Sequence, residues 1–385
     1  PVFGVSDVHA RAIGDLYKAF HRHTTVRILI VVDGSVSLTE APSGFGVGRI
    51  VRLLRESHIG CTHFEVDTAR RDASNAGAPR YSGFRFDQFE GGAPVLNQYQ
   101  EVWCFGFHPG NNDGAPDSDI TQPGALPASD AELKALTVWM NERRGGLLAM
   151  GDHDYLGASM CHRIPRIRSM RRWTNAQGVP PIGGAARPDT ALRHDTNQPF
   201  TAAQMTGGAL IPFGNQEDSK PQRIDWVPWI SHPVSIFRVH SRPHPVLCHP
   251  VHGPIDVMPD HPHEGWCFED DEIDLSATYS FVDLQGDEYP TVGGNQPRPM
   301  VIAHGTTTPN PPYNLEKGPS PKKRFGMVSV YDGHPAGGGR VATDSTWHHW
   351  FDENIQAIEA AGGENWDKIS RYFLNVASWL APPVW

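Results

Sequence analysis

Short apolar runs separated by amphipathic segments dominate the first part of the chain. Residues 27–32 (RILIVV) form a continuous apolar run that ends at Asp33-Gly34, a pattern typical of a strand buried on both faces. Residues 64–66, 101–107 (EVWCFGF) and 147–150 are the next strand candidates.

Two amphipathic helices are expected between these strands. The first is predicted to be capped by Ser43 and to end at Gly60, with an apolar stripe at Val47, Ile50, Val51 and Leu54. The second is predicted to begin at a capping box of Ser129 and Glu132 and to continue to Arg144. Strands that alternate with helices predict an α/β protein with a flavodoxin-like, doubly wound and mainly parallel sheet.

The middle of the chain has a different character. Residues 161–299 begin with a basic stretch and continue as Pro/Gly-rich loops with scattered tryptophans. We interpret them as a loop-rich insertion or lid that divides the α/β domain into residues 1–160 and residues 300–385. Strand candidates return at 300–303, 326–331 and 340–343, and a helical apolar stripe covers 369–380 before Pro382-Pro383.

Composition narrows the classes of function. The net charge of -10 over 385 residues leaves no basic excess for neutralising phosphates, which argues against a nucleic-acid partner. No apolar run approaches the roughly 20 residues of a membrane span, and the first residues of the sequence do not have a signal-peptide pattern. The 5 cysteines include no CxxC pair and indicate reduced thiols. With Pro1 interpreted as the residue left after removal of an initiator Met, we expect a cytoplasmic protein with a small-molecule substrate.

Candidate chemistry gathers where strands end, the place at which open parallel sheets bind ligands. Asp33 follows the first strand, His108 follows the third, and Asp152 with His153 follows the fourth. Each one alone has an ordinary explanation, since Asp and Gly favour turns. Their convergence favours a site, and we assign Asp33 and His108 to substrate binding.

The segment LLAMGDHDYLG at 147–157 has the strand, tight turn and helix of a nucleophile elbow. Its turn holds Asp152 and His153 in place of Ser or Cys, so metal binding or proton transfer fits better than acyl transfer. The alternative is that Asp152 or Asp154 only caps the helix that follows.

A second cluster, HPVHGPIDVMPDHPHE at 249–264, is rich in imidazoles and carboxylates. His261 and His263 would share one face of a strand, and with Asp260 and His153 they are candidate ligands for zinc, iron or manganese. A polar loop braced by prolines is the equal alternative.

The third cluster is TDSTWHHWFDE at 343–353. His348 and His349 follow the last strand, and a carboxylate from Asp352 or Glu353 one turn later would orient an imidazole. Trp347 and Trp350 are expected to wall the substrate site, unless these aromatic residues pack around a structural histidine.

The order of these features resembles the class I glutamine amidotransferase-like superfamily, and its ThuA-like branch in particular. The resemblance covers about the first 160 and the last 90 residues. It implies a flavodoxin-like sheet, an elbow near Asp152-His153, and a His/acid pair at His348 or His349 with Asp352 or Glu353. The elbow Cys of the superfamily is missing, so glutamine hydrolysis through a thioester is not expected.

Three functions follow from these patterns. The first is a hydrolase or lyase that acts on a small polar substrate, a carbohydrate or an amide, through Asp152, His153, His348 and His349, with or without a metal. The second is a non-catalytic sugar-binding protein of degenerate amidotransferase-like fold. The third is a nucleotide-dependent oxidoreductase, based only on the glycine-rich GFGVG at 44–48 and on Asp67.

Overall fold

A central β-sheet organises the computed structural model of the chain. The structure describes residues 24–40, 45–108, 126–151, 157–173, 221–235, 238–259, 267–306 and 324–382. Five core strands lie side by side in the order β3-β1-β7-β8-β20, and all four pairings between them are parallel. These strands are β1 (Thr24–Val32), β3 (Thr62–Arg70), β7 (Glu101–Phe105), β8 (Gly146–Met150) and β20 (Val341–Asp344). The structure confirms the predicted α/β class, and each of these five strands overlaps a predicted strand.

The sheet as a whole is mixed. Beyond β20 it continues through β19 (Arg324–Tyr331), β18 (Met300–Thr306) and β10 (Asp225–Trp226), and each of these pairings is antiparallel. The reversal between β19 and β20 has a simple cause, because residues 332–340 are too few for the crossover that two parallel strands need. At the other edge lie β2 (His58–Ile59), which is antiparallel to β3, and the short β4 (Tyr81–Ser82).

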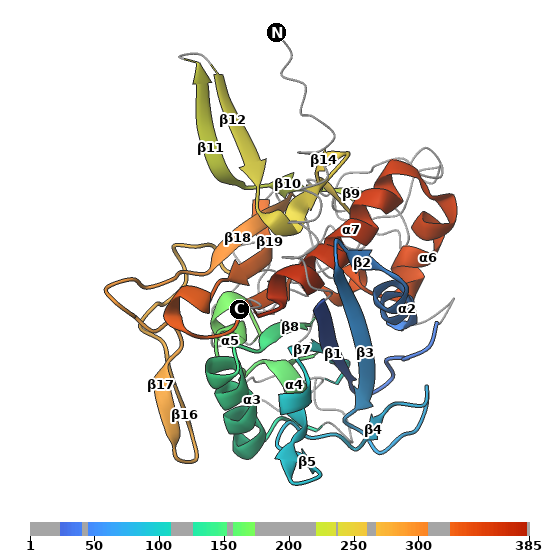
Figure 1. Cartoon of the computed structure of the whole chain (residues 1–385), viewed down its shortest axis with the longest axis vertical. Coiled ribbons are helices and arrows are strands. Elements are labelled where there is room, and N and C mark those ends of the chain that lie inside the picture. Colours follow the sequence, from blue (N-terminus) through green and yellow to red (C-terminus); the bar gives the residue numbers. More distant parts are fainter. Residues whose placement is uncertain are drawn as a thin grey trace, which may run out of the picture.

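Helices cover both faces of the sheet (Figure 1). One face packs against α2 (Gly48–Glu56), α6 (Asp352–Ala361) and α7 (Gly363–Leu380). The other packs against α3 (Asp130–Glu142), α4 (Ala158–Cys161) and α5 (Ile167–Met170). Strand β1 serves both layers, because Ile28 and Ile30 join the first core while Leu29 and Val31 join the second.

The capping of two helices differs in origin. Helix α3 begins at the predicted box, in which the Ser129 hydroxyl accepts from the backbone N–H of Glu132 and the Glu132 carboxylate accepts from the backbone N–H of Ser129. Helix α2 begins at Gly48 and ends at Glu56, later and earlier than predicted. Its N-cap, Val47, offers no side-chain hydrogen bond, and Ser43 lies outside the described residues. Asp352, far away in the chain, accepts from the backbone N–H of Arg49 at 2.8 Å instead.

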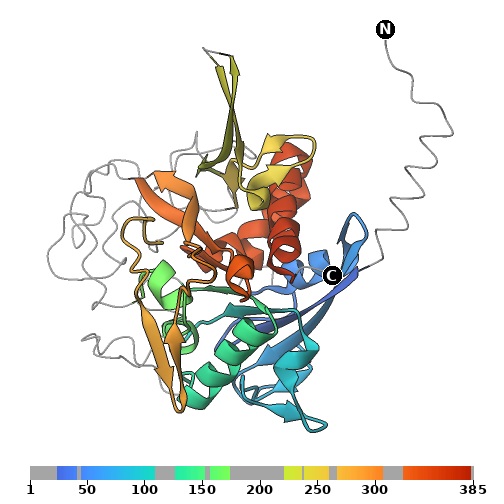
Figure 2. The same cartoon turned by 60° about the vertical axis from the view of Figure 1, so that its left-hand side comes forward.

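The described part of the middle segment packs on the sheet edge and on α7. Strand β10 extends the sheet, and the hairpin of β11 (Pro228–Ser235) and β12 (Arg238–Pro243) projects from the body (Figure 2). The turn η6 (Pro245–Leu247) and the strands β13 (Cys248–His249) and β15 (Val257–Met258) contact α7.

Short elements complete the described chain. They are β5 (Phe89–Glu90), β6 (Ala93–Pro94), η1 (Val95–Gln98), β9 (Gln222–Arg223), β14 (Gly253–Pro254), β16 (Thr278–Phe281), β17 (Leu284–Asp287), η7 (His334–Ala336) and η8 (Trp347–His349). Among the described helices, none combines the length and the apolar character that crossing a bilayer requires. All five cysteines are free thiols.

Candidate active site

An imidazole and a carboxylate pair closely at the carboxyl end of β20. The strand ends at Asp344, and η8 turns the chain back so that His349 faces this residue. Nδ1 of His349 lies 2.9 Å from Oδ1 and 3.0 Å from Oδ2 of Asp344. Both residues are fully buried.

Further donors hold the Asp344 carboxylate in place. The indole Nε1 of Trp350 donates to Oδ2 at 3.2 Å, and the hydroxyl of Tyr372 donates to the same oxygen at 3.3 Å. Burial raises the pKa of Tyr372 well above its usual value, and the nearby Asp344 charge raises it further, so the hydroxyl keeps its proton. We assign the proton of this contact to Nδ1 of His349, because an ionised carboxylate can only accept a hydrogen bond.

Asp33 and His108 form a second polar group at the same edge. Oδ1 of Asp33 accepts from the backbone N–H groups of Phe107 and His108, the latter at 3.1 Å. Burial raises the pKa of Asp33, opposed by these two hydrogen bonds. Oδ2 of Asp33 and Nδ1 of His108 are buried without a hydrogen-bond partner among the described residues. The His108 ring also covers Gly34, where an added Cβ would lie 3.0 Å from Nε2 of the ring.

The two groups follow different strands of the sheet. β1 and β20 are three strand spacings apart in the sheet order, so the axes of these strands lie about 14 Å apart. Aromatic rings fill the space above the sheet edge: Trp347 stacks on Phe107 with ring centroids 5.5 Å apart, and Phe45 packs against Phe107 and against the edge of His348. In the described part of the chain, the Asp344–His349 pair and the Asp33–His108 group are not hydrogen-bonded to each other.

The residues predicted to orient a histidine have different surroundings. Asp344 supplies a carboxylate that is hydrogen-bonded to His349. Asp352 is fully buried and accepts from the backbone N–H of Arg49 at the start of α2. Glu353 is half-buried in the first turn of α6. Asp352 and Glu353 were predicted because they follow His348 and His349 by about one helical turn. In the structure the helix α6 begins only at Asp352, so the two histidines lie outside it.

Trp347 and Trp350 are core residues in the structure. Trp350 is fully buried, with its ring 5.5 Å from Trp103 and 5.0 Å from Phe373, and Trp347 is 1% exposed. Neither indole offers an open face to a ligand in this arrangement. Their predicted contact with substrate would require this edge of the sheet to open.

Several predicted residues lie outside the described part of the chain: Asp152, His153, Asp260, His261 and His263. Within the described residues, no group of three or more His, Cys, Asp or Glu side chains is arranged to hold a metal ion. The described part of the 249–264 cluster packs along α7, where Nε2 of His252 lies 3.1 Å from Oδ2 of Asp367.

Gly157 packs closely against the end of β8. Its φ of +86° is in the left-handed region, and an added Cβ would lie 2.9 Å from Cα of Gly151. Its backbone N–H donates to the carbonyl of His108 at 3.1 Å. The close backbone approach joins the ends of β7 and β8 at the edge where ligands are expected.

Asp344 and Tyr372 had no predicted role. Asp344 was visible as the polar end of the last strand, whereas Tyr372 was part of an apolar helical stripe and gave no signal of its own. Comparison of the chain with protein-family models, with curated proteins and with solved structures finds no match. The site is therefore interpreted from its own geometry.

Proposed function

We propose that the protein is a hydrolase that acts on a small polar substrate, a carbohydrate or an amide, with His349 as its general base. The observation that carries the proposal is the contact of His349 Nδ1 with both oxygens of the buried Asp344. A buried carboxylate that fixes the tautomer and the orientation of an imidazole is the arrangement that makes histidine an effective base. Its place beyond a parallel strand is where sheets of this class bind ligands.

In the proposed reaction, Nε2 of His349 takes the proton of an attacking water molecule and later returns it to the leaving group. Asp344 stabilises the imidazolium formed between these two steps. Because His349 is fully buried, the chain at this edge has to open before a substrate reaches Nε2. Asp33 and His108 lie further along the same edge and are proposed to contact the more distant part of the substrate.

A metal-assisted form of the reaction remains part of the proposal. Asp152, His153, Asp260, His261 and His263 carry donors suited to zinc, iron or manganese, and a bound metal would supply an activated water. The proposed relation to the ThuA-like branch of the amidotransferase-like superfamily is supported by the five parallel core strands and by the histidine after the last of them. A cytoplasmic location is supported by the five free thiols.

The test compares the effect on turnover of neutralising two buried aspartates, Asp344 at the proposed site and Asp352 as the control. Wild type, His349→Ala, Asp344→Asn and the control Asp352→Asn are assayed on chromogenic glycosides, esters and amides, before and after chelation and with added zinc or manganese. Loss of the base or of its orienting carboxylate is expected to lower kcat by at least about 100-fold, while Asp352→Asn retains activity. Turnover that is unchanged in His349→Ala removes this residue from the mechanism.

A sugar-binding protein without catalysis is the second candidate, favoured by the complete burial of His349. It predicts that sugars raise the Tm of the wild type and of His349→Ala equally, with no substrate turned over. The hydrolase predicts turnover that depends on His349. The same panel of sugars therefore separates the two functions.

A further inference from the structure

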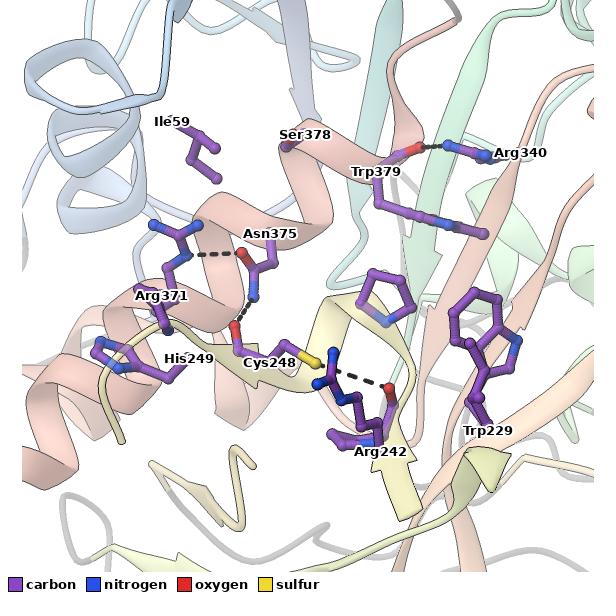
Figure 3. A pocket seen from close by; sticks show the side chains of 14 residues that line it. Ile59, Trp229, Arg242, Cys248, His249, Arg340, Arg371, Asn375, Ser378 and Trp379 are labelled. Atoms are coloured by element: carbon purple, nitrogen blue, oxygen red, sulfur yellow. Dashed lines mark hydrogen bonds between the residues drawn. The ribbon is translucent and has the colours of Figure 1, made fainter. Parts of the chain in front are cut away.

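A cavity of about 560 Å³ lies on the outer side of α7, between this helix and the middle segment of the chain. Its walls come from β11, β12, β13 and α7 (Figure 3). The cavity also touches Arg340, which directly precedes β20, whereas Asp344 is the last residue of this strand. The cavity and the proposed active site therefore lie at opposite ends of β20.

The cavity has an uncompensated positive charge. Three arginines and His249 line it, and its described lining includes no aspartate or glutamate. Arg340 is neutralised by Asp332, with Nε 3.0 Å from Oδ1. Arg242 and Arg371 have no carboxylate within ion-pair distance in the described part of the chain.

Arg371 is held in position by the buried Asn375. Its Nε donates to Oδ1 of Asn375 at 2.8 Å. Nδ2 of Asn375 donates to the carbonyls of Cys248 at 2.8 Å and of Val246 at 3.1 Å, which ties α7 to the middle segment (Figure 3). One edge of the guanidinium is thus fixed, and its two terminal nitrogens have no hydrogen-bond partner among the described residues.

Two tryptophans, Trp229 and Trp379, also line the cavity. Trp229 is 45% exposed, and its ring packs edge-on against His244 at 5.4 Å. His244 in turn packs edge-on against Trp379 at 5.1 Å. An exposed indole beside a hollow offers a flat apolar surface that a planar ring can cover.

We propose that this cavity binds a small organic anion in which a carboxylate or a phosphate is attached to a flat ring. The anionic group would lie between Arg242 and Arg371, since the planar guanidinium matches both oxyanions through paired hydrogen bonds. The ring would pack against Trp229. The size is suitable, because pockets for small molecules begin at about 300 Å³.

The electrostatics of neighbouring groups agree with this assignment. Burial lowers the pKa of Arg371, and no acidic neighbour opposes the shift. Burial also lowers the pKa of His249, and the charges of His252 and Arg371 lower it further. A bound anion would relieve both effects, so binding should raise the pKa of His249.

Phenyl phosphate, benzoate, inorganic phosphate and benzyl alcohol are the probes, with affinity measured by calorimetry and His249 followed by NMR. We expect the two aromatic anions to bind, the free phosphate to bind more weakly, and the neutral alcohol not to bind. Whichever of phenyl phosphate and benzoate binds more tightly identifies the anionic group. Addition of the tighter probe should shift the titration of His249 to higher pH.

Arg371→Gln and Arg242→Gln are each expected to weaken binding about tenfold or more, and Trp229→Ala to abolish the preference for aromatic anions over free phosphate. Arg223→Gln, an equal change of charge on the exposed face of the same segment, is the control and should bind as wild type does. Equal binding of benzyl alcohol, or full affinity in the Arg242→Gln/Arg371→Gln double variant, overturns the proposal. Because binding is measured without turnover, a failure of the proposed hydrolase leaves this result unaffected.

Discussion

The hydroxyl of Tyr372 donates a hydrogen bond to Oδ2 of Asp344 at 3.3 Å, so helix α7 holds the carboxylate that orients His349. The contact joins the last long helix to the end of a central strand, with both side chains buried. It makes the geometry of the candidate site depend on how α7 packs on the sheet.

Removal of the Tyr372 hydroxyl should have a smaller effect than neutralisation of Asp344. Tyr372→Phe loses one hydrogen bond of several to the carboxylate and is expected to lower the free energy of unfolding by about 1 kcal/mol. Asp344→Asn removes the negative charge beside His349, and we expect it to lower the free energy of unfolding by about 3 kcal/mol. Urea denaturation of the two variants measures the difference. Equal costs would mean that the charge of Asp344 contributes nothing to the buried network.

Asp352 is expected to act on stability and not on chemistry. Asp352→Ala removes the acceptor for the backbone N–H of Arg49 at the start of α2, at a cost of about 1 kcal/mol. Asp352→Asn keeps an acceptor oxygen and should lose less. Thermal denaturation ranks the two variants. A loss of turnover in Asp352→Asn without a change in Tm would return this residue to the active site.

Glu101 should make the protein less stable as the pH rises. Burial raises the pKa of Glu101 well above its usual value, and only the Trp103 indole, donating to Oε2 at 2.9 Å, opposes the shift. Above the pKa of the unfolded chain, the unfolded state ionises while the folded state keeps its proton, so the free energy of unfolding falls as the pH rises toward the folded pKa. Glu101→Gln keeps an acceptor for Trp103 and removes the titration.

As the pH rises from about 5 to about 8, we therefore expect the free energy of unfolding of Glu101→Gln to increase by about 1 kcal/mol or more relative to that of wild type. Urea denaturation at both values provides the measurement. An exposed carboxylate, in Glu65→Gln, is the control and should leave the pH slope of the wild type in place. A Glu101→Gln slope parallel to that of wild type would show that Glu101 ionises in the folded protein.

His244 should make the protein less stable as the pH falls. Burial lowers its pKa from 6.5 to about 4, and the charge of Arg340 contributes. Between these two pH values the unfolded chain binds a proton at His244 and the folded protein does not. The contribution of His244 to the free energy of unfolding is therefore fully present above the unfolded pKa and is lost as the pH falls. The loss approaches about 3 kcal/mol near pH 4.

His244→Asn is designed to remove only the titration. Nδ1 of His244 accepts from the backbone N–H of Val246 at 3.3 Å, and an asparagine oxygen serves as the same cap. The variant loses ring packing at neutral pH and should show a flatter decline in stability between about pH 6.5 and about pH 4. Denaturation midpoints across this range measure it. A decline as steep as that of wild type would assign the acid sensitivity to other groups.

The strands of the core were predictable because they are buried on both faces, which makes residues 28–32 and 147–150 continuous apolar runs. The start of α3 was predictable because Ser129 and Glu132 are three positions apart in the sequence. The start of α2 was not, because its cap comes from Asp352, and no local pattern reports a contact over that separation. The antiparallel end of the sheet was missed for a related reason, since strand direction depends on the length of the connection and not on the strand itself.

The polar end of the last strand indicated His349 as a candidate residue, and the spacing in the sequence suggested Asp352 or Glu353 as its carboxylate. In the structure Asp344 also contacts His349, and no pattern in the sequence indicated that contact. A 3-10 turn, which the pattern of residues did not reveal, folds His349 back toward Asp344. The cavity behind α7 gave no signal, because Arg371 and Asn375 look like ordinary polar positions of an amphipathic helix.

The position of β20 has a consequence for how the chain is made. This strand lies between β8 and β19 in the sheet, although a long stretch of chain separates it from β8 in sequence. As a ribosome delivers the chain from its first residue, β8 emerges with all five residues apolar or glycine and with one edge unpaired. Such an edge invites pairing with other chains until β20 and α7 arrive to cover it. Synthesis therefore passes through a long interval in which a chaperone, or rapid translation of the remaining segment, would protect the half-built sheet.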